Sequence, residues 1–143
     1  MKTPILETSR LWLKPLKEED APGAFLWTGD PKVSWYMRYE THESLEDTKQ
    51  WLREEEKQLD SDLLYDFGFH KKDSDELIGS GGLTFNQQQG IWELGCNLRR
   101  DCWNQGYGTE AAAAILSFAE NTLHIHRVMA RHAKDNTASG RVL

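Results

Sequence analysis

A turn with two glycines divides this chain into a part with strand-like alternation and a part with helical periodicity. The turn, Gln105–Thr109, follows a strand-like run and precedes residues 110–121, where small apolar side chains recur at helical spacing. Another strand-like run, 127–133, follows this helix. A helix that connects two neighbouring strands in this way makes them parallel, and the connection is right-handed. The sequence therefore predicts one strand–helix–strand crossover.

The runs before the turn predict an antiparallel arrangement. They span residues 63–71, 76–85 and 90–98, and short polar segments join them. Short polar connections suit hairpins, so we expect an antiparallel meander. Together with the crossover, the meander gives an α+β fold with one mixed sheet.

The first part of the chain predicts one strand and a short helix. Leu11 and Leu13 alternate with polar residues and Pro15 follows them, which favours a strand over residues 8–16 near a sheet edge. A short helix is expected over residues 21–27.

A longer amphipathic helix is expected after Ser44. Ser44 and Asp47 resemble a capping box, with Asp in place of the usual Glu or Gln. The apolar face of this helix is predicted from leucines at seven-residue spacing, which are Leu45, Leu52 and Leu59.

Composition and charge narrow the classes of partner. With 143 residues, of which 38% are hydrophobic, the chain is about the size of one domain with one core. The net charge is −6 and no segment gathers the basic residues, which argues against nucleic acid as a partner.

No signal peptide or membrane-length apolar run is present, so we expect a cytoplasmic protein without a membrane partner. Cys96 and Cys102 are expected to be reduced.

The glycine turn has the chemistry of an anion site. A helix that begins there presents unpaired backbone N–H groups at the positive end of its dipole. Gly106 and Gly108 would let a pyrophosphate approach the backbone, and Thr109 adds a hydroxyl donor. The turn lacks the Lys of a P-loop and the third glycine of a dinucleotide fingerprint. Glycines that merely fit a tight turn are the alternative interpretation.

Several motifs together resemble the GNAT superfamily of N-acetyltransferases. Residues 103–111, with Glu93–Gly95 before them and Asn136–Leu143 after them, resemble its acetyl-CoA-binding core. The match is closest to the Rim branch, which acetylates ribosomal-protein N-termini, and Glu7–Leu16 resembles the first strand of that branch. The resemblance implies a GNAT-like acyl-CoA N-acyltransferase fold. It also implies transfer of an acetyl group from acetyl-CoA to a primary amine, either a peptide α-amine or a small amine, without a metal.

The sequence also departs from the pattern of this family. Trp103 stands where the superfamily commonly has Gln or Arg, although the Rim branch often has Trp there. Asn104 replaces a glycine that is usual in the branch. The family continues through a helix and closing strands beyond the position of Leu143, so we interpret residues 1–143 as one acetyltransferase domain that is incomplete at its C-terminus.

The resemblance assigns roles to individual residues. It implies that Glu93 is a general base acting through water, with a solvent-facing strand carboxylate as the alternative. Ser139 would be the acid that protonates the departing thiolate. The residues implied in cofactor binding are Leu98, Gln105, Gly106, Tyr107, Gly108, Thr109 and Asn136. For Asn136, the cap of a terminal helix is the alternative.

Other residues invite functional interpretations that we weigh against structural ones. His124, His126 and His132 could suggest a metal site, but no carboxylate or Cys stands at ligand spacing, so we expect them at a strand edge. Glu110 is expected to point away from the anion site. The family's acceptor pocket would include an early aromatic cluster, for which core packing is the alternative: Trp27, Trp35, Tyr36, Met37 and Tyr39.

Two functions of other classes compete with acetyl transfer. One is a non-catalytic CoA-binding or interaction module. The other is nucleotide binding at the same turn, which the absence of Lys and of a ribose-binding acid disfavours. The acceptor and the oligomeric state are left open, and a homodimer is one alternative.

Overall fold

The computed structural model describes residues 1–34 and 41–130. In these residues, six strands form one sheet in the order β1-β2-β3-β4-β5-β6. The strands are β1 (Leu6–Glu7), β2 (Leu11–Lys14), β3 (Leu64–Lys71), β4 (Leu77–Asn86), β5 (Ile91–Leu98) and β6 (Val128–Ala130). The helices are α1 (Ala21–Thr28), α2 (Pro31–Ser34), α3 (Leu45–Lys57) and α4 (Tyr107–Asn121), with 3-10 turns η1 (Glu18–Asp20) and η2 (Arg100–Cys102).

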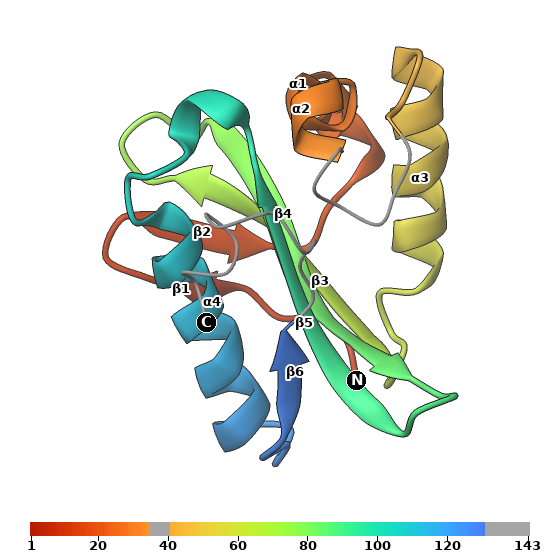
Figure 1. Cartoon of the computed structure of the whole chain (residues 1–143), viewed down its shortest axis with the longest axis vertical. Helices are drawn as coiled ribbons and strands as arrows, with labels where there is room; N and C mark the ends of the chain where they lie inside the picture. The colour runs from red at the N-terminus through yellow and green to blue at the C-terminus, as the bar shows by residue number, and fades with distance from the viewer. Residues whose placement is uncertain (35–40, 131–143) are drawn as a thin grey trace.

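The pairing of the strands confirms the predicted mixed sheet. Strands β1 to β5 pair antiparallel, each with its neighbour in the chain, whereas β5 and β6 pair parallel. Helix α4 connects the parallel pair and covers one face of the sheet, while α1, α2 and α3 lie over the other face (Figure 1). The crossover and the meander expected from the sequence are both present.

The main core lies between the sheet and α4. Phe67 and Phe69 of β3 are fully buried, as are Ala111 and Ile115 of α4. The Phe118 ring meets the Phe67 ring edge-on, with centroids 5.9 Å apart. Small side chains on α4 let the helix approach the strands closely, and each large buried side chain contributes about 1.5–3 kcal/mol. This packing fixes where α4 begins relative to the end of β5.

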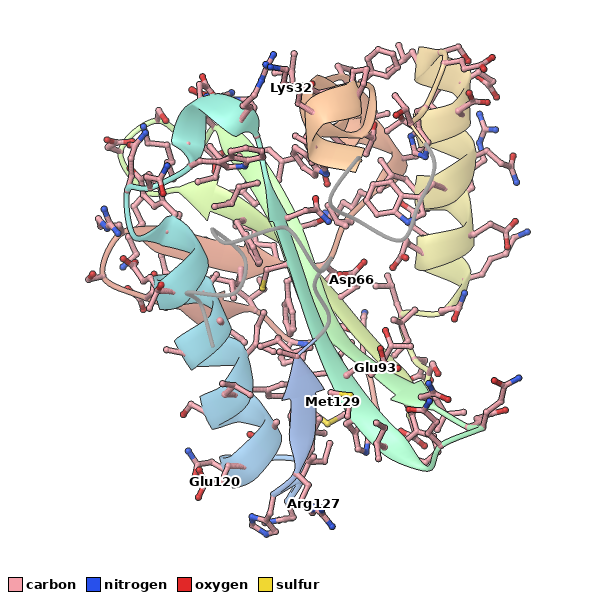
Figure 2. The ribbon with its side chains drawn as sticks, in the orientation of Figure 1. Lys32, Asp66, Glu93, Glu120, Arg127 and Met129 are labelled. Carbon is pink, nitrogen blue, oxygen red and sulfur yellow. The ribbon has the colours of Figure 1, made fainter. Side chains whose placement is uncertain are left out.

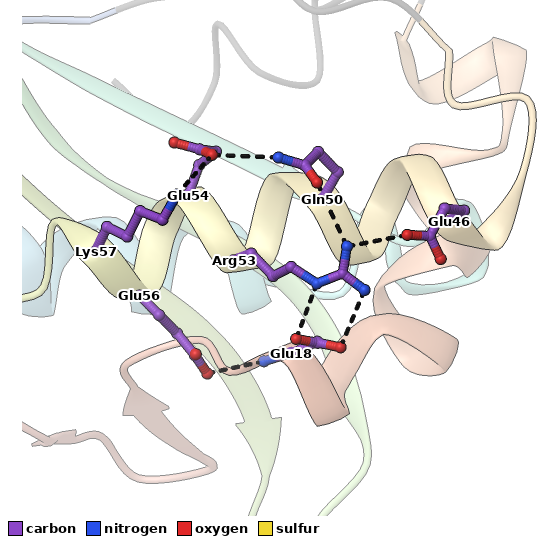
Figure 3. Close-up of polar contacts among 7 residues, drawn as sticks. All are labelled: Glu18, Glu46, Gln50, Arg53, Glu54, Glu56 and Lys57. Atoms are coloured by element: carbon purple, nitrogen blue, oxygen red, sulfur yellow. Dashed lines mark hydrogen bonds and ion pairs between the residues drawn. The ribbon is translucent and has the colours of Figure 1, made fainter.

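A second core lies on the opposite face, under α1 and α3. Trp27, Val33 and Leu52 are each at most 1% exposed. At the surface, Arg53 of α3 forms a bidentate pair with Glu18 of η1, at 3.0 Å from Nε and 3.3 Å from Nη2, and also binds Glu46 (Figure 3). These exposed pairs contribute little individually, but they orient α3 on the face it covers.

Two sequence predictions need correction. The first strand is two short strands, because Thr8 closes a turn in which its Oγ1 accepts a hydrogen bond from the Leu11 N–H at 3.0 Å. Helix α3 stops at Lys57, and of the predicted leucine face only Leu52 is fully buried, since Leu45 is 38% exposed. The Ser44 cap is confirmed, because its Oγ accepts from the Asp47 N–H at 3.4 Å.

Candidate active site

The glycine turn lies where the sequence placed it, between the end of β5 and the start of α4. Gly106 is the N-cap residue and has φ +85°, a left-handed conformation that glycine adopts without penalty. Asn104 is also left-handed, with φ +62°. Asparagine tolerates this conformation better than other residues with a side chain, which explains how it can replace glycine there.

Side chains of the loop itself brace the turn. Trp103 Nε1 donates to the Leu98 carbonyl at 2.9 Å, and Gln105 Nε2 donates to the Asp101 carbonyl at 2.8 Å. Two of the residues predicted to bind the cofactor, Leu98 and Gln105, therefore take part in holding the loop. Trp103, the departure from the superfamily pattern, links the loop to the last residue of β5.

The start of α4 has the properties of an anion site. Gly106 supplies no side-chain cap, and the first N–H groups of a helix have no intrahelical acceptor. Tyr107 and Gly108 are buried, whereas Gly106 and Thr109 are exposed. The structure thus brings the predicted residues 106–109 together at a solvent-facing helix start. Asn136 and Ser139 lie outside the described residues.

Glu110 has partners that the sequence did not reveal. Its Oε1 accepts from Arg10 Nε at 2.7 Å, and its Oε2 accepts from the Arg10 backbone N–H at 2.8 Å and from the Thr8 hydroxyl. Burial opposes ionisation of this carboxyl, but the hydrogen bonds from Thr8 and Arg10 outweigh it and lower the pKa of Glu110. We predicted no role for Glu110, and the structure shows that it joins α4 to the β1–β2 turn.

Arg10, which is paired with Glu110, also contacts the glycine turn. Its guanidinium lies over the Tyr107 ring, 4.2 Å from the centroid, and its Nη1 donates to the Gln105 carbonyl at 3.1 Å. A Cβ added to Gly106 would lie 3.2 Å from Arg10 Nη2. No local pattern signals this neighbour, because Arg10 and Gln105 are 95 positions apart in the sequence.

A pocket of about 230 Å³ lies on the other face of the sheet, beneath α1 and α3. Trp27 of α1 and two residues of α3, Trp51 and Glu55, form its helical wall. The strands contribute polar side chains, Asp66, Ser80 and Asn97, and the backbone of three glycines, Gly81, Gly82 and Gly95. Of the aromatic cluster predicted for the acceptor pocket, Trp27 lines this cavity, while Trp35, Tyr36, Met37 and Tyr39 lie outside the described residues.

Glu93 lies on the same face of the sheet as this pocket. It pairs in register with Thr84, which lines the pocket, and it is two residues from Gly95 on β5 (Figure 2). The residue is 6% exposed, and its Oε1 accepts from Asn86 Nδ2 at 2.8 Å. Glu93 is therefore buried, unlike the solvent-facing carboxylate of the alternative interpretation. Its role as a base is still a prediction.

Glu55 and Asp66 form a carboxyl pair that sequence reasoning missed. Glu55 projects from α3 and hydrogen-bonds to Asp66 of β3, which Figure 2 shows between the sheet and α3. Burial, the negative charge of Asp66 and this hydrogen bond raise the pKa of Glu55 to about 9, and a 3.1 Å bond from Trp51 Nε1 opposes the shift. The charged residues of α3 follow a pattern that is typical of a solvated face, so no sequence pattern indicates this pair.

The described residues were also searched for a metal-binding group and for a membrane-spanning helix. His124 and His126 are exposed and lie between α4 and β6, rather than on a strand, and His132 lies outside the described residues. Within residues 1–34 and 41–130, no group of three or more His, Cys, Asp and Glu side chains is arranged to hold a metal ion. None of the helices described is both long and apolar enough to span a bilayer.

Comparison with known proteins identifies the family. Residues 10–143 match the family described as "Acetyltransferase (GNAT) domain". The chain is 28% identical to the uncharacterized N-acetyltransferase p20 of Bacillus licheniformis, over 96% of this chain and 78% of p20. It is likewise 28% identical to the uncharacterized N-acetyltransferase YoaA of Bacillus subtilis, over 98% of this chain and 80% of YoaA.

Solved structures show the same fold. A GNAT-family acetyltransferase from Bacillus anthracis has a TM-score of 0.83 at 23% identity, covering 97% of this chain and 80% of that one. The ribosomal-protein α-N-acetyltransferase RimL, solved in complex with coenzyme A, has a TM-score of 0.78 at 17% identity, with coverage of 97% and 80%. Fold and sequence together define an acetyltransferase, and the chain belongs to the GNAT acetyltransferase domain family.

Proposed function

We propose that this chain transfers an acetyl group from acetyl-CoA to a primary amine by direct attack on the thioester. The arrangement around β5 carries the proposal. The end of this strand leads through η2 to the exposed helix start at Gly106, and its Gly95 and Asn97 line the pocket beneath α1 and α3. An anion site and an acceptor pocket beside one strand end would hold two substrates close together, which is the main requirement of group transfer.

On the donor side, the backbone N–H groups of residues 107–109 would bind the pyrophosphate of acetyl-CoA. The glycine turn gives the phosphates access to these groups, and the guanidinium of Arg10, which is paired with Glu110, lies beside them as a hydrogen-bond donor. Leu98 and Gln105 would act by fixing the shape of the loop. Asn136 is proposed as a further contact on the strength of the family resemblance.

On the acceptor side, an alkyl amine is mostly protonated at neutral pH and must lose a proton to attack. Glu93 is buried on the pocket face of β5, so we propose that it takes this proton through a water molecule. The amine nitrogen then bonds to the carbonyl carbon and loses a second proton to water, the C–S bond breaks, and the departing thiolate takes a proton. Family resemblance supports Ser139 as the donor of that proton.

Calorimetry with acetyl-CoA and with ATP, followed by a thiol-release assay on a panel of amines, tests this function. We expect acetyl-CoA to bind, ATP not to compete with it, and free thiol to be released only when an amine is present. Failure to bind acetyl-CoA would exclude the proposal. Binding without transfer to any amine would instead support a non-catalytic CoA-binding module.

A further inference from the structure

The loop that carries the glycine turn also reaches the helices on the opposite face of the sheet. Arg100 of η2 and Asp30, which lies between α1 and α2, form an ion pair with Nε and Oδ2 3.0 Å apart. Neither residue takes part in the proposed acetyl transfer. Since η2 leads to the proposed donor site and α1 forms a wall of the pocket beneath α1 and α3, this pair connects the two places where substrates are proposed to bind.

Asp30 is fixed to the corner between α1 and α2 by its side chain and its backbone. Its Oδ1 accepts a hydrogen bond from the Lys32 backbone N–H at 3.0 Å, so both carboxylate oxygens have partners. Its own N–H donates to the Trp27 carbonyl at 3.1 Å, and its carbonyl accepts from the Val33 N–H at 3.0 Å. The position of Arg100 therefore acts through Asp30 on α2 and on the pocket-lining end of α1.

On the donor side, the position of Arg100 depends on the glycine turn. Gln105 Nε2 donates to the Asp101 carbonyl at 2.8 Å, so the residue before Gly106 is bonded to the residue after Arg100. The Trp103 backbone N–H donates to the Arg100 carbonyl at 3.2 Å, which closes the 3-10 turn. A phosphate group held at Gly106 would therefore restrain Arg100 through short hydrogen-bonded steps.

A packing contact accompanies the ion pair. Trp103, midway between Arg100 and Gly106 in the sequence, is partly buried against the core cluster that contains Trp27 of α1 and Val33 of α2. Two contacts of different kinds thus join the same loop to the same two helices. The loop and the α1–α2 corner form one connected unit.

The ion pair is poorly placed to stabilise the fold by itself. The Arg100 side chain is 50% exposed, and ion pairs at the surface contribute little to stability. On the other side of the loop, the start of α4 is already held to the β1–β2 turn by Arg10 and Glu110, with Nε and Oε1 2.7 Å apart. The effect of Arg100 is therefore expected on the relation between the two sites.

We propose that Arg100 and Asp30 are positioning residues that couple the donor site to the acceptor pocket, so that acetyl-CoA at the glycine turn holds the α1 wall in place. The inference rests on the proposed acetyl-CoA site and specifies how that site acts on the pocket. A ligand that fixes the loop keeps the ion pair formed, and a formed pair opposes local opening of the α1–α2 corner. Such coupling is reciprocal, so an amine in the pocket raises the affinity for acetyl-CoA by the same factor.

Hydrogen exchange of residues 26–34, measured with and without acetyl-CoA, tests the coupling without knowledge of the acceptor. We expect acetyl-CoA to slow exchange in this segment by roughly 2- to 5-fold in the unmodified protein, the strength of one surface ion pair. The slowing should disappear in Arg100→Gln and in Asp30→Asn, which keeps an oxygen for the Lys32 N–H, while acetyl-CoA still protects residues 107–110. Arg100→Lys keeps the charge and should retain the slowing.

Steady-state kinetics give a second readout with an amine from the panel that accepts the acetyl group. Arg100→Gln should raise KM for that amine by roughly 2- to 5-fold and leave kcat within about twofold, because a less fixed wall weakens binding without touching the reacting atoms. A fall in kcat at unchanged KM would contradict a positioning role.

Arg53→Gln is the matched control, because it removes exposed ion pairs with Glu18 and Glu46 that lie outside this path. It should leave the response of residues 26–34 to acetyl-CoA unchanged. A purely structural Arg100 would affect exchange equally with and without acetyl-CoA, so a response that persists in Arg100→Gln overturns the proposal. Protection of residues 107–110 without any slowing at 26–34 in the unmodified protein also overturns it, while acetyl transfer stands. If acetyl-CoA does not bind at all, the proposed function fails first and the coupling fails with it.

Discussion

Glu110 and Arg10, 100 residues apart in the sequence, are joined by a 2.7 Å hydrogen bond from Arg10 Nε and a 2.8 Å hydrogen bond from the Arg10 backbone N–H. The first links side chains, and the second ties the carboxylate to the backbone of the β1–β2 turn. Through these bonds the start of α4 is fixed to the N-terminal hairpin. The same Arg10 lies beside Gly106, so the contact that stabilises the fold also shapes the anion site.

Replacing Glu110 with Gln should reduce the stability of the folded protein. The substitution replaces charge-assisted hydrogen bonds by neutral ones, and we expect a loss of about 1.5–3 kcal/mol in the free energy of unfolding at pH 7. Since the folded state lowers the pKa of Glu110, its contribution is present above the unfolded-state pKa and disappears as pH falls through the folded-state pKa. Urea unfolding of both proteins should therefore show a difference at pH 7 that vanishes in acid.

Glu120→Gln is the control for this prediction. Glu120 is exposed near the end of the same helix (Figure 2), so the same chemical change should shift the unfolding midpoint little at any pH. A Glu110→Gln protein as stable as the Glu120→Gln protein at pH 7 would contradict the role assigned to the contact.

Gly106→Ala should weaken acetyl-CoA binding. The alanine would have to adopt φ +85°, at a cost of about 1–3 kcal/mol, and its Cβ would crowd Arg10 Nη2 at 3.2 Å. Gly90→Ala is a close control, because Gly90 has φ +67° and no atoms near the position of an added Cβ. We expect both variants to lose stability in thermal unfolding and only Gly106→Ala to lose affinity in calorimetry. Equal affinities would remove the glycine turn from the donor site.

Local patterns predicted most of the fold. The meander, the crossover helix and the turn at Gly106 each depend on residues that are close in sequence, where periodicity and turn chemistry are informative. The first strand was predicted as one element because nothing in the alternation at Leu11 and Leu13 shows that the Thr8 hydroxyl closes a turn before them. Heptad spacing puts Leu45 on the apolar face of its helix but does not show how much of that face is covered, and Leu45 is 38% exposed.

The candidate site was only partly predictable for a related reason. The donor side is a local motif, and its residues are found together. Two other pairs join elements that are not adjacent in the sequence: Arg10 with Glu110, and Glu55 with Asp66. The sequence alone does not show whether Glu55 of α3 and Glu110 of α4 face solvent or a partner. Leu52 of α3 belongs to the same core cluster as Trp27 of α1, and this packing sets which side of α3 faces the sheet, where Glu55 interacts with Asp66.

Trp103→Phe should separate support of the loop from direct binding. The change keeps an aromatic ring but removes the Nε1 donor, so the Leu98 carbonyl loses its 2.9 Å hydrogen bond. We expect a loss of about 1 kcal/mol in the free energy of unfolding and a several-fold weaker affinity for acetyl-CoA, because the loop that presents the helix start is less fixed. Calorimetry and urea unfolding measure both effects. Stability that falls with affinity unchanged would show that the loop brace does not shape the donor site.

Glu93→Gln should slow acetyl transfer far more than it weakens acetyl-CoA binding. The amide is close in size and can still interact with Asn86, but it cannot take a proton, and general base catalysis contributes about 10²- to 10⁴-fold. We therefore expect kcat to fall within that range, the affinity for acetyl-CoA to stay within about twofold, and the loss to be smaller at high pH, where more of the amine is already neutral. Steady-state kinetics across pH, with an amine from the panel that accepts the acetyl group, measure all three, and Glu120→Gln serves as the control. If kcat and its pH dependence match those of the unmodified enzyme, Glu93 is a structural carboxylate held by Asn86, and the proton from the amine leaves by another route.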